Sequence, residues 1–216
     1  MNVKAVRAER ASATRESILA TAERLFAEHG VQVVSNRHIS EAAGQGNNAA
    51  VNYHFGTKTD LVRAITRKHS ERVERLRAEL VEAINGPGEL RDWVACLIRP
   101  TTTYLRELGS PTWFARFTAQ VLTDPALRAI IAEESMASPA LAKVVAGLYR
   151  SLSVLPPDVR AERGDMARQL MIHMTAERER ALAEGTATPR ATWDDAGTGL
   201  IDAVTGLLLA PVTAPS

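Results

Sequence analysis

Apolar residues recur every three or four positions near the start of the chain, which is the period of an α-helix with one buried face. The apolar residues of that face are Ile18, Leu19, Ala22, Leu25 and Phe26. Ser12 is a suitable N-cap, and Gly30 can take the left-handed conformation that ends a helix. The pattern predicts a first helix over about residues 12 to 29.

A second, shorter helix is predicted over about residues 36 to 43. Ser35 is its N-cap, and Val34 before it is spaced to pack on Ile39, which is the arrangement of a hydrophobic staple. Its buried residues are expected to be Ile39, Ala42 and Ala43. Gly44 ends it.

A third helix is expected from the N-cap Asn47 to Phe55, after a tight turn, with Val51 and Phe55 on its inner face. Its outer face carries Asn48, Ala49, Asn52 and Tyr53. Two short helices joined by a glycine-containing turn are typical of a helix-turn-helix. In the major groove, Asn can pair with adenine and Ala can contact a thymine methyl, so this helix is predicted to read DNA.

The pair Thr57 and Asp60 has the spacing of a capping box and predicts a long helix that extends to about residue 84. Lys58 projects from the first turn of that helix, where free backbone N–H groups and the helix dipole favour an anion. We expect Lys58 to hold a phosphate.

No strand pattern appears after residue 85, and several helix starts do. An N-cap residue precedes a proline at Ser110-Pro111, Asp124-Pro125 and Ser138-Pro139. The predicted helices cover about residues 89 to 107, with a kink at Pro100, then 111 to 122, 125 to 135, 139 to 153, 157 to 184 and 193 to 209. The fold is therefore expected to be all-α, with a helix-turn-helix DNA-binding domain at residues 1–56 and a helical ligand-binding and dimerisation domain at residues 57–216.

Composition narrows the class of protein. Hydrophobic residues make up 45% and charged residues 24%, as in ordinary globular proteins. No apolar run is long enough for a membrane span or a signal peptide, so we expect a cytoplasmic protein without a membrane partner. The single cysteine, Cys96, has apolar neighbours and is expected to be a buried thiol. No ligand spacing for a metal or a cofactor is visible, and none is expected.

The charge is unevenly distributed. Residues 1–75 hold 12 Lys and Arg against 8 Asp and Glu, so the other 141 residues hold 14 against 17, given 26 and 25 in all. A basic first third joined to an acidic remainder is consistent with a polyanion-binding unit, although a solvated charged face gives the same pattern.

Residues 12 to 62 resemble the TetR family of bacterial transcriptional regulators. The resemblance rests on TRESIL with a following LF and G, then S-x-R-x-I-S-x-A-A-G, a short helix ending in YHF, and G-T-K-T-D-L. It implies that the third helix enters the major groove and that the following lysine binds a phosphate. The positions implied to face DNA are Arg37, Asn47, Asn48, Ala49, Ala50, Asn52, Tyr53, His54 and Lys58. The chain departs from the commonest pattern by one extra residue between Gly44 and Phe55, and by Asn52 where tyrosine is frequent.

Structural alternatives remain for several of these residues. Asn47 can be a pure N-cap, Tyr53 can pack between helices, and His54 can be a buried polar residue. Arg37 can pair with a local carboxylate. Before the first predicted helix, Lys4, Arg7 and Arg10 are expected to form a basic arm that is disordered without DNA.

A cavity for a small-molecule effector is implied by the resemblance. Its candidate lining residues are Trp93, Tyr104, Trp113, Phe114, Phe117 and His173. Each can equally fill the core of a helical bundle.

The last two predicted helices are expected to form a homodimer interface. The candidate interface residues are Leu170, Met174, Gly199, Leu200, Ala203, Val204, Gly206 and Leu207. A helix-turn-helix dimer would bind a palindromic double-stranded DNA operator.

These features predict a ligand-responsive transcriptional regulator that acts as a repressor. The alternative is an all-helical enzyme or an adaptor without DNA binding, but no catalytic spacing of Ser, His, Cys or acidic residues is visible.

Overall fold

The computed structural model describes residues 3–45 and 49–213, and these residues form helices, turns and loops. The helices are α1 (Val3–His29), α2 (Asn36–Ala42), α3 (Ala50–Phe55), α4 (Lys58–Glu82), α5 (Leu90–Leu108), α6 (Phe114–Thr123), α7 (Pro125–Met136), α8 (Pro139–Ser151), α9 (Pro157–Ala183) and α10 (Trp193–Leu209). Within the described part, no helix is long and apolar enough to cross a membrane. The predicted all-α class is confirmed.

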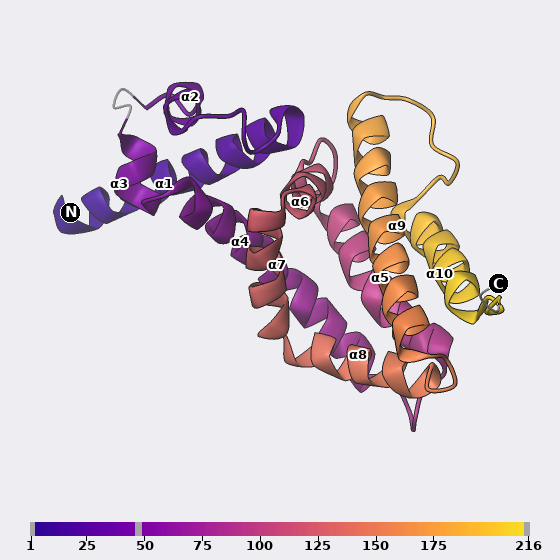
Figure 1. Ribbon diagram of the computed structural model, residues 1–216. Helices are drawn as coiled ribbons and strands as arrows, with labels where there is room; N and C mark the ends of the chain where they lie inside the picture. Colours follow the sequence, from indigo (N-terminus) through magenta and orange to yellow (C-terminus); the bar gives the residue numbers. More distant parts are fainter. Residues whose placement is uncertain (1–2, 46–48, 214–216) are drawn as a thin grey trace.

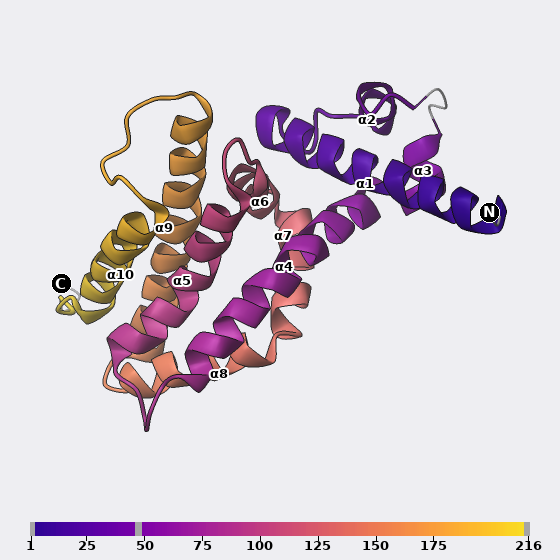
Figure 2. The same cartoon turned by 180° about the vertical axis from the view of Figure 1, so that it is seen from behind.

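The molecule has a head, α1 to α3, and a body, α4 to α10. Figure 1 shows the head at one end and the pair α9 and α10 at the other, with α4 running from the head into the body. The reverse view in Figure 2 shows the same order, with α5 between α4 and α10. Consequently α2 and α3 lie far from the C-terminal helices.

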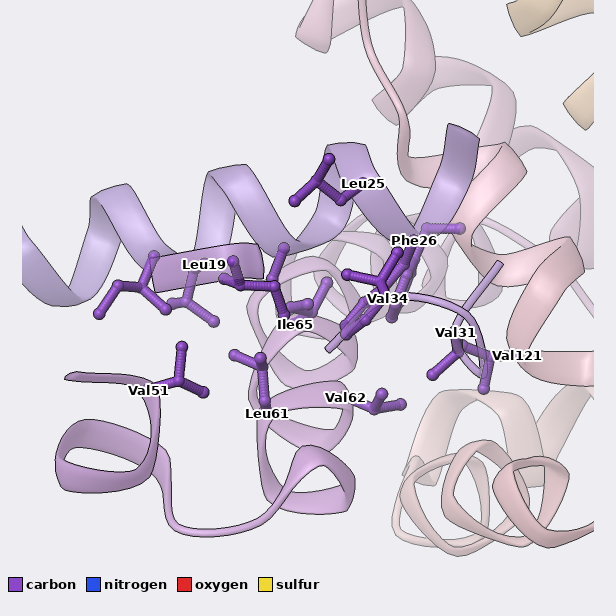
Figure 3. Packing of buried hydrophobic residues seen from close by; sticks show 14 of the residues in the cluster. Leu19, Leu25, Phe26, Val31, Val34, Val51, Leu61, Val62, Ile65 and Val121 are labelled. Atoms are coloured by element: carbon purple, nitrogen blue, oxygen red, sulfur yellow. The ribbon is translucent and has the colours of Figure 1, made fainter. Parts of the chain in front are cut away.

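A hydrophobic core holds the head together and attaches it to the body. Figure 3 shows Leu19 of α1, Val51 of α3 and Leu61 of α4 pointing toward one another. The same cluster continues into α6, where the ring of Phe117 stacks on Phe26 of α1 with 6.3 Å between ring centroids. The head therefore packs on α6 as well as on α4.

Local capping signals begin most helices where the sequence predicts. Ser35 accepts a hydrogen bond from the His38 amide, and Thr57 forms a reciprocal capping box with Asp60. The other side-chain caps at predicted starts are Asp124, Ser138 and Thr192. Each of these caps satisfies backbone N–H groups that have no partner inside the helix.

The starts of α1 and α3 differ from the prediction. The first helix begins at Val3, so Arg7 and Arg10 are exposed helical residues and not part of a disordered arm. The third helix begins at Ala50 and has Ala49 as N-cap without a side-chain hydrogen bond. Asn47, the predicted cap, lies outside the described residues.

The start of α6 is also later than predicted, at Phe114 and not at residue 111. The carboxylate of Glu179, on α9, accepts hydrogen bonds from the backbone N–H groups of Ala115 and Arg116 at 2.9 and 3.0 Å. Arg116 Nε also lies 3.1 Å from this carboxylate. A side chain distant in sequence therefore caps α6, where local sequence pointed to Ser110.

Two predictions about buried residues have opposite outcomes. Cys96 is buried at 4% exposure, as expected, in a cluster with Trp93 and Val144. Ala42 is exposed, contrary to expectation, because the seven-residue helix α2 turns only Ile39 and Ser40 fully into the protein.

Candidate nucleic-acid interface and effector cavity

A side-chain hydrogen bond holds α3 against α2. Asn36 Nδ2, at the start of α2, donates to Asn52 Oδ1 in α3 with 2.7 Å between the atoms. Beneath this bond, Ile39 and Val51 are both fully buried in the same hydrophobic cluster. The two contacts fix the angle at which α3 is presented. Sequence reasoning missed Asn36, because a polar residue in the first turn of a helix is read as a surface position.

Two of the residues predicted for the outer face of α3 are confirmed as exposed to solvent. Tyr53 is 83% exposed, and Asn52 is exposed as well. Ala49, which precedes the helix, is also exposed. Ala50 is different: it is buried at 7% exposure, so its methyl group faces the core. Asn48 lies outside the described residues.

Aromatic contacts support the end of α3. His54 is half-buried and meets the edge of the Tyr53 ring, with centroids 5.0 Å apart. The guanidinium of Arg15, on α1, lies over the ring of Phe55 at 4.7 Å from its centroid. Phe55 is half-buried, so this cation–π contact covers the part of the ring that the core does not.

Arg37 is paired with a local carboxylate, one of the two arrangements open from the sequence. Its Nε donates to Glu41 Oε1 at 2.8 Å, and this hydrogen bond raises the pKa of Arg37. The Arg37 side chain is 73% exposed. Exposed pairs of this kind contribute little to stability, so the guanidinium can change partners at little cost.

Lys58 lies where the head, the α1–α2 loop and α4 meet. Its Nζ donates to the carbonyl oxygen of Val31 at 3.0 Å, and the side chain is half-buried. An ammonium group has three N–H donors, so this bond leaves donors for another oxygen. The capping box of Thr57 and Asp60 fixes the turn from which Lys58 projects.

A cavity of about 350 Å³ lies in the body between α4, α5, α6, α7 and α8. Its apolar lining comprises Val73, Phe114, Phe117, Ile131 and Leu141. Its polar side carries the ion pair of Arg77 Nη1 and Glu74 Oε2 at 3.0 Å. Glu74 also accepts a hydrogen bond from the Ala140 amide at 2.8 Å, and burial lowers the pKa of Arg77. The sequence signal for this pair was the i, i+3 spacing of two opposite charges on the long helix.

The predicted aromatic cluster is divided among several places. Only Phe114 and Phe117 line this cavity. Trp93 packs in the cluster around Cys96, and Trp113 packs against the core of the head. Tyr104 is buried, and His173 is exposed on α9. The separation arises because neighbours in sequence point to different sides of a helix.

An apolar groove of about 490 Å³ lies along α9 and α10. Five of the predicted interface residues line it: Leu170, Met174, Gly199, Leu200 and Ala203. Gly206 is exposed with open space around it, and Leu207 is half-buried. Val204 is completely buried within the chain, so its side chain belongs to the core.

Comparisons with known proteins identify relatives. A family model described as bacterial regulatory proteins, tetR family, matches residues 18–65. HTH-type transcriptional repressor AcnR of Corynebacterium glutamicum is 36% identical over 87 residues, which are 38% of this chain and 46% of that protein. AcnR of Corynebacterium efficiens is 32% identical over 128 residues, or 56% of this chain and 66% of that protein. The matched part thus spans about half the length of the first of these relatives.

Solved structures share the fold over most of the chain. A TetR family transcriptional regulator, PfmR from Thermus thermophilus, has a TM-score of 0.52 at 18% identity, covering 91% of this chain and 96% of that one. A putative TetR-family regulator from Mesorhizobium loti has a TM-score of 0.51 at 15% identity, covering 92% and 96%. The N-terminal segment of the chain thus matches the family model described as bacterial regulatory proteins, tetR family, and the whole chain shares the all-helical fold of solved TetR-family regulators.

Proposed function

We propose that this protein is a transcriptional repressor that binds a palindromic DNA operator as a homodimer and is released by a small molecule bound in the body. The observation that carries the proposal is the presentation of α3. Asn36 and Val51 hold the helix, while Tyr53 and Asn52 stay exposed at the end of the molecule opposite α9 and α10.

The exposed residues suit different parts of DNA. Asn52 still has amide atoms beyond the one bonded to Asn36, and an amide can pair with a base edge. Arg37 can exchange Glu41 for a phosphate. Lys58 can add a phosphate oxygen to its bond with Val31. Further contacts are proposed for Asn47, Asn48, Ala49, Tyr53 and His54, and Ala50 is left out because it is buried.

A second copy of the chain is proposed to cover the groove along α9 and α10. The groove is apolar, and Met174 and Ala203 are exposed in it, so pairing would remove apolar surface from water. Such a dimer carries two copies of α3. Helix-turn-helix dimers contact half-sites roughly 34 to 36 Å apart or a multiple of this distance, which makes the operator palindromic.

The cavity between α4 and α8 is the proposed effector site. Residues of α4 form one of its walls, and the first residue of the same helix is Lys58. An effector that displaces α4 would therefore move a proposed phosphate contact. A coupling of about 1 to 3 kcal/mol between the two sites changes operator affinity roughly 5- to 150-fold.

The Corynebacterium relatives are named as transcriptional repressors, which supports the proposal that this protein represses transcription. No catalytic activity is proposed for this chain, and a regulator of this kind would act on DNA in the cytoplasm.

Selection of genomic fragments by the purified protein tests this function. The selected duplex and a shuffled duplex of equal length are then titrated with protein at two fixed salt concentrations. We expect the selected duplex to bind at least about a thousandfold more tightly, and both affinities to fall steeply with salt. Equal affinity for the two duplexes would contradict the proposal.

A further inference from the structure

Three buried polar side chains connect the head with the body. The ring of His69, on α4, is 2% exposed. Its Nε2 lies 3.0 Å from Glu23 Oε2 of α1, and its Nδ1 lies 2.9 Å from Tyr104 Oη of α5. Glu23 is 7% and Tyr104 8% exposed, so water does not compete for these contacts as it does at the surface.

The group of three also touches the cavity wall. The ring of Phe114, which lines the cavity, stacks on His69 with 4.4 Å between centroids and an angle of 25°. The same ring meets Tyr104 edge to face at 5.6 Å. A displacement of Phe114 therefore changes its contacts with both His69 and Tyr104.

The hydrogen-bonding capacities of the three side chains select one arrangement of protons. With a proton on Nε2, His69 places an N–H group 3.0 Å from Glu23 Oε2, as a close polar contact and not an aligned hydrogen bond, while its Nδ1 pairs with the Tyr104 hydroxyl. The other tautomer would direct a lone pair at a carboxylate oxygen. Burial, followed by the charges of Glu23 and Glu107, raises the pKa of Tyr104, which keeps its hydroxyl proton in place.

Charged groups near Tyr104 form pairs of their own. Arg72, on α4, binds Glu107 of α5 through two hydrogen bonds, of which the Nε one is 2.9 Å long. The positive charges of Arg72 and Arg75 lower the pKa of Tyr104, against the effect of the carboxylates. Glu23 is thus the acidic partner at hydrogen-bonding distance from the His69 ring.

Among the other contacts between head and body, Lys58 bonds to the carbonyl of Val31 but lies away from the cavity lining. The stack of Phe26 on Phe117 is apolar and contains no hydrogen bond. The bond from Gln32 to Asp124 and the pair of Glu16 with Lys68 are exposed, so water can replace them. A buried hydrogen bond weakens steeply when its geometry changes, which makes it sensitive to small movements.

We propose that Glu23, His69 and Tyr104 form a latch that transmits the state of the cavity to the head. This rests on the proposed function, because it supplies the route between the effector site and the DNA-binding helices. While Phe114 in the cavity wall stays stacked on His69, the latch fixes α1 against α4 and α5. A molecule that displaces Phe114 turns the His69 ring and breaks its contact with Glu23, which releases α1. His69 is a positioning residue and contacts neither DNA nor effector.

The first test examines the latch without DNA or effector. Protein labelled with ¹⁵N-histidine is studied by NMR at neutral pH, and the His69 signals are assigned with the variant His69→Gln. We expect Nε2 to carry a proton, and the Nδ1 resonance to shift in Tyr104→Phe, which removes only the hydroxyl. An Nε2 without a proton, or an Nδ1 resonance unchanged in Tyr104→Phe, overturns the proposal.

The second test measures transmission. Because coupling between sites is reciprocal, binding of the selected duplex at the head should alter amide hydrogen exchange at the cavity wall. We expect exchange in the α6 peptide that contains Phe114 to change about tenfold on DNA binding, the effect of one hydrogen bond of ordinary net strength. In Tyr104→Phe and Glu23→Gln this response should disappear while the duplex still binds. Tyr149→Phe, at an exposed tyrosine on α8, is the matched control and should keep the response.

The outcomes separate the two proposals. If the unchanged protein has no preference for a selected duplex, the proposed function fails, and the NMR result still decides the proton arrangement. If the duplex binds and α6 responds equally in the protein and in Tyr104→Phe, the latch is refuted and the DNA-binding function stands.

Discussion

The ammonium of Lys58 donates a hydrogen bond to the main-chain carbonyl of Val31, across 27 positions of sequence and 3.0 Å of space. Val31 is buried in the core of the head, and its neighbour Gln32 bonds to Asp124, the N-cap of α7. The proposed phosphate-binding lysine is therefore tied to a loop that contacts both the core of the head and the body.

Replacing Lys58 by alanine should weaken binding to all duplexes alike. The loss of one phosphate contact lowers the slope of log affinity against log salt by about 1 and leaves sequence preference unchanged. Titration of the selected and shuffled duplexes over a range of salt concentrations measures both quantities. Lys143→Ala, at an exposed lysine of α8, is the control. An unchanged salt slope in Lys58→Ala would remove this residue from the interface.

The bond between Asn36 and Asn52 should matter for recognition although Asn36 is not a proposed DNA contact. Asn36→Ala frees α3 to shift, so discrimination between selected and shuffled duplexes should fall by about 1 kcal/mol or more. Residues in one hydrogen-bonded pair couple by about 0.5 to 3 kcal/mol, so the double variant with Asn52→Ala should cost less than the sum of the two. Strict additivity in this cycle would mean that the bond does not position α3.

Glu179 should be a strong contributor to stability. Its side chain is 1% exposed and binds the start of α6 together with Arg116. Glu179→Ala leaves Arg116 Nε and the amides of Ala115 and Arg116 without their acceptor, although Arg116 Nη2 keeps the Thr112 carbonyl. We expect the free energy of unfolding to fall by about 3 kcal/mol or more. Urea unfolding at fixed protein concentration measures it. Glu162→Ala, at an exposed glutamate of α9 outside the groove, should change stability by less than about 0.5 kcal/mol.

The proposed dimer can be tested at Ala203, which is exposed and lines the groove along α9 and α10. Ala203→Arg introduces a charge that would be buried between two copies, so the variant should be a monomer with unchanged helix content. Sedimentation velocity and circular dichroism measure these two properties. Ala142→Arg, on the exposed side of α8, should leave the assembly intact. A variant at Ala203 that sediments like the unchanged protein would place the interface elsewhere.

Stability should decrease in acid, and the direction follows from three carboxyl groups. Hydrogen bonds from Thr57 lower the pKa of Asp60, those from Gln32 lower the pKa of Asp124, and those from Arg67 lower the pKa of Glu134. The unfolded chain, in which such groups titrate near about pH 4, then binds more protons than the folded one. The stabilisation is complete above that pH and is lost as the pH falls through the lowered values.

Urea unfolding between pH 3 and pH 6, at one protein concentration, follows this loss. Asp60→Asn should flatten the pH dependence, because it removes one of the three groups. Glu179 opposes the trend, since burial raises its pKa. A free energy of unfolding that increases steadily from pH 6 to pH 3 would contradict the expected direction.

The sequence alone determined the helices, and it did so through contacts that close within one turn. Ser35 accepts a hydrogen bond from the amide three residues ahead, and the side chains of Thr57 and Asp60 each accept a hydrogen bond from the other's amide. The TetR resemblance covers this part of the chain. Helix α3 was placed by its apolar face for the same reason. Ala50 was implied to face DNA by the family resemblance and not by the helical period, and in the structure its methyl group is buried beside Val51.

Only the tertiary structure decided which side chains meet across the helices. Glu179 caps α6 from 64 positions away, and His69 reaches Tyr104 across 35. No local period records such pairs, because they depend on how whole helices cross. The same reason explains the division of the aromatic residues: Phe114 faces the cavity and the latch, while Trp113 next to it turns toward the head. The chain thus encodes the helices of its head locally, and the connection of that head to the cavity arises only when the helices pack.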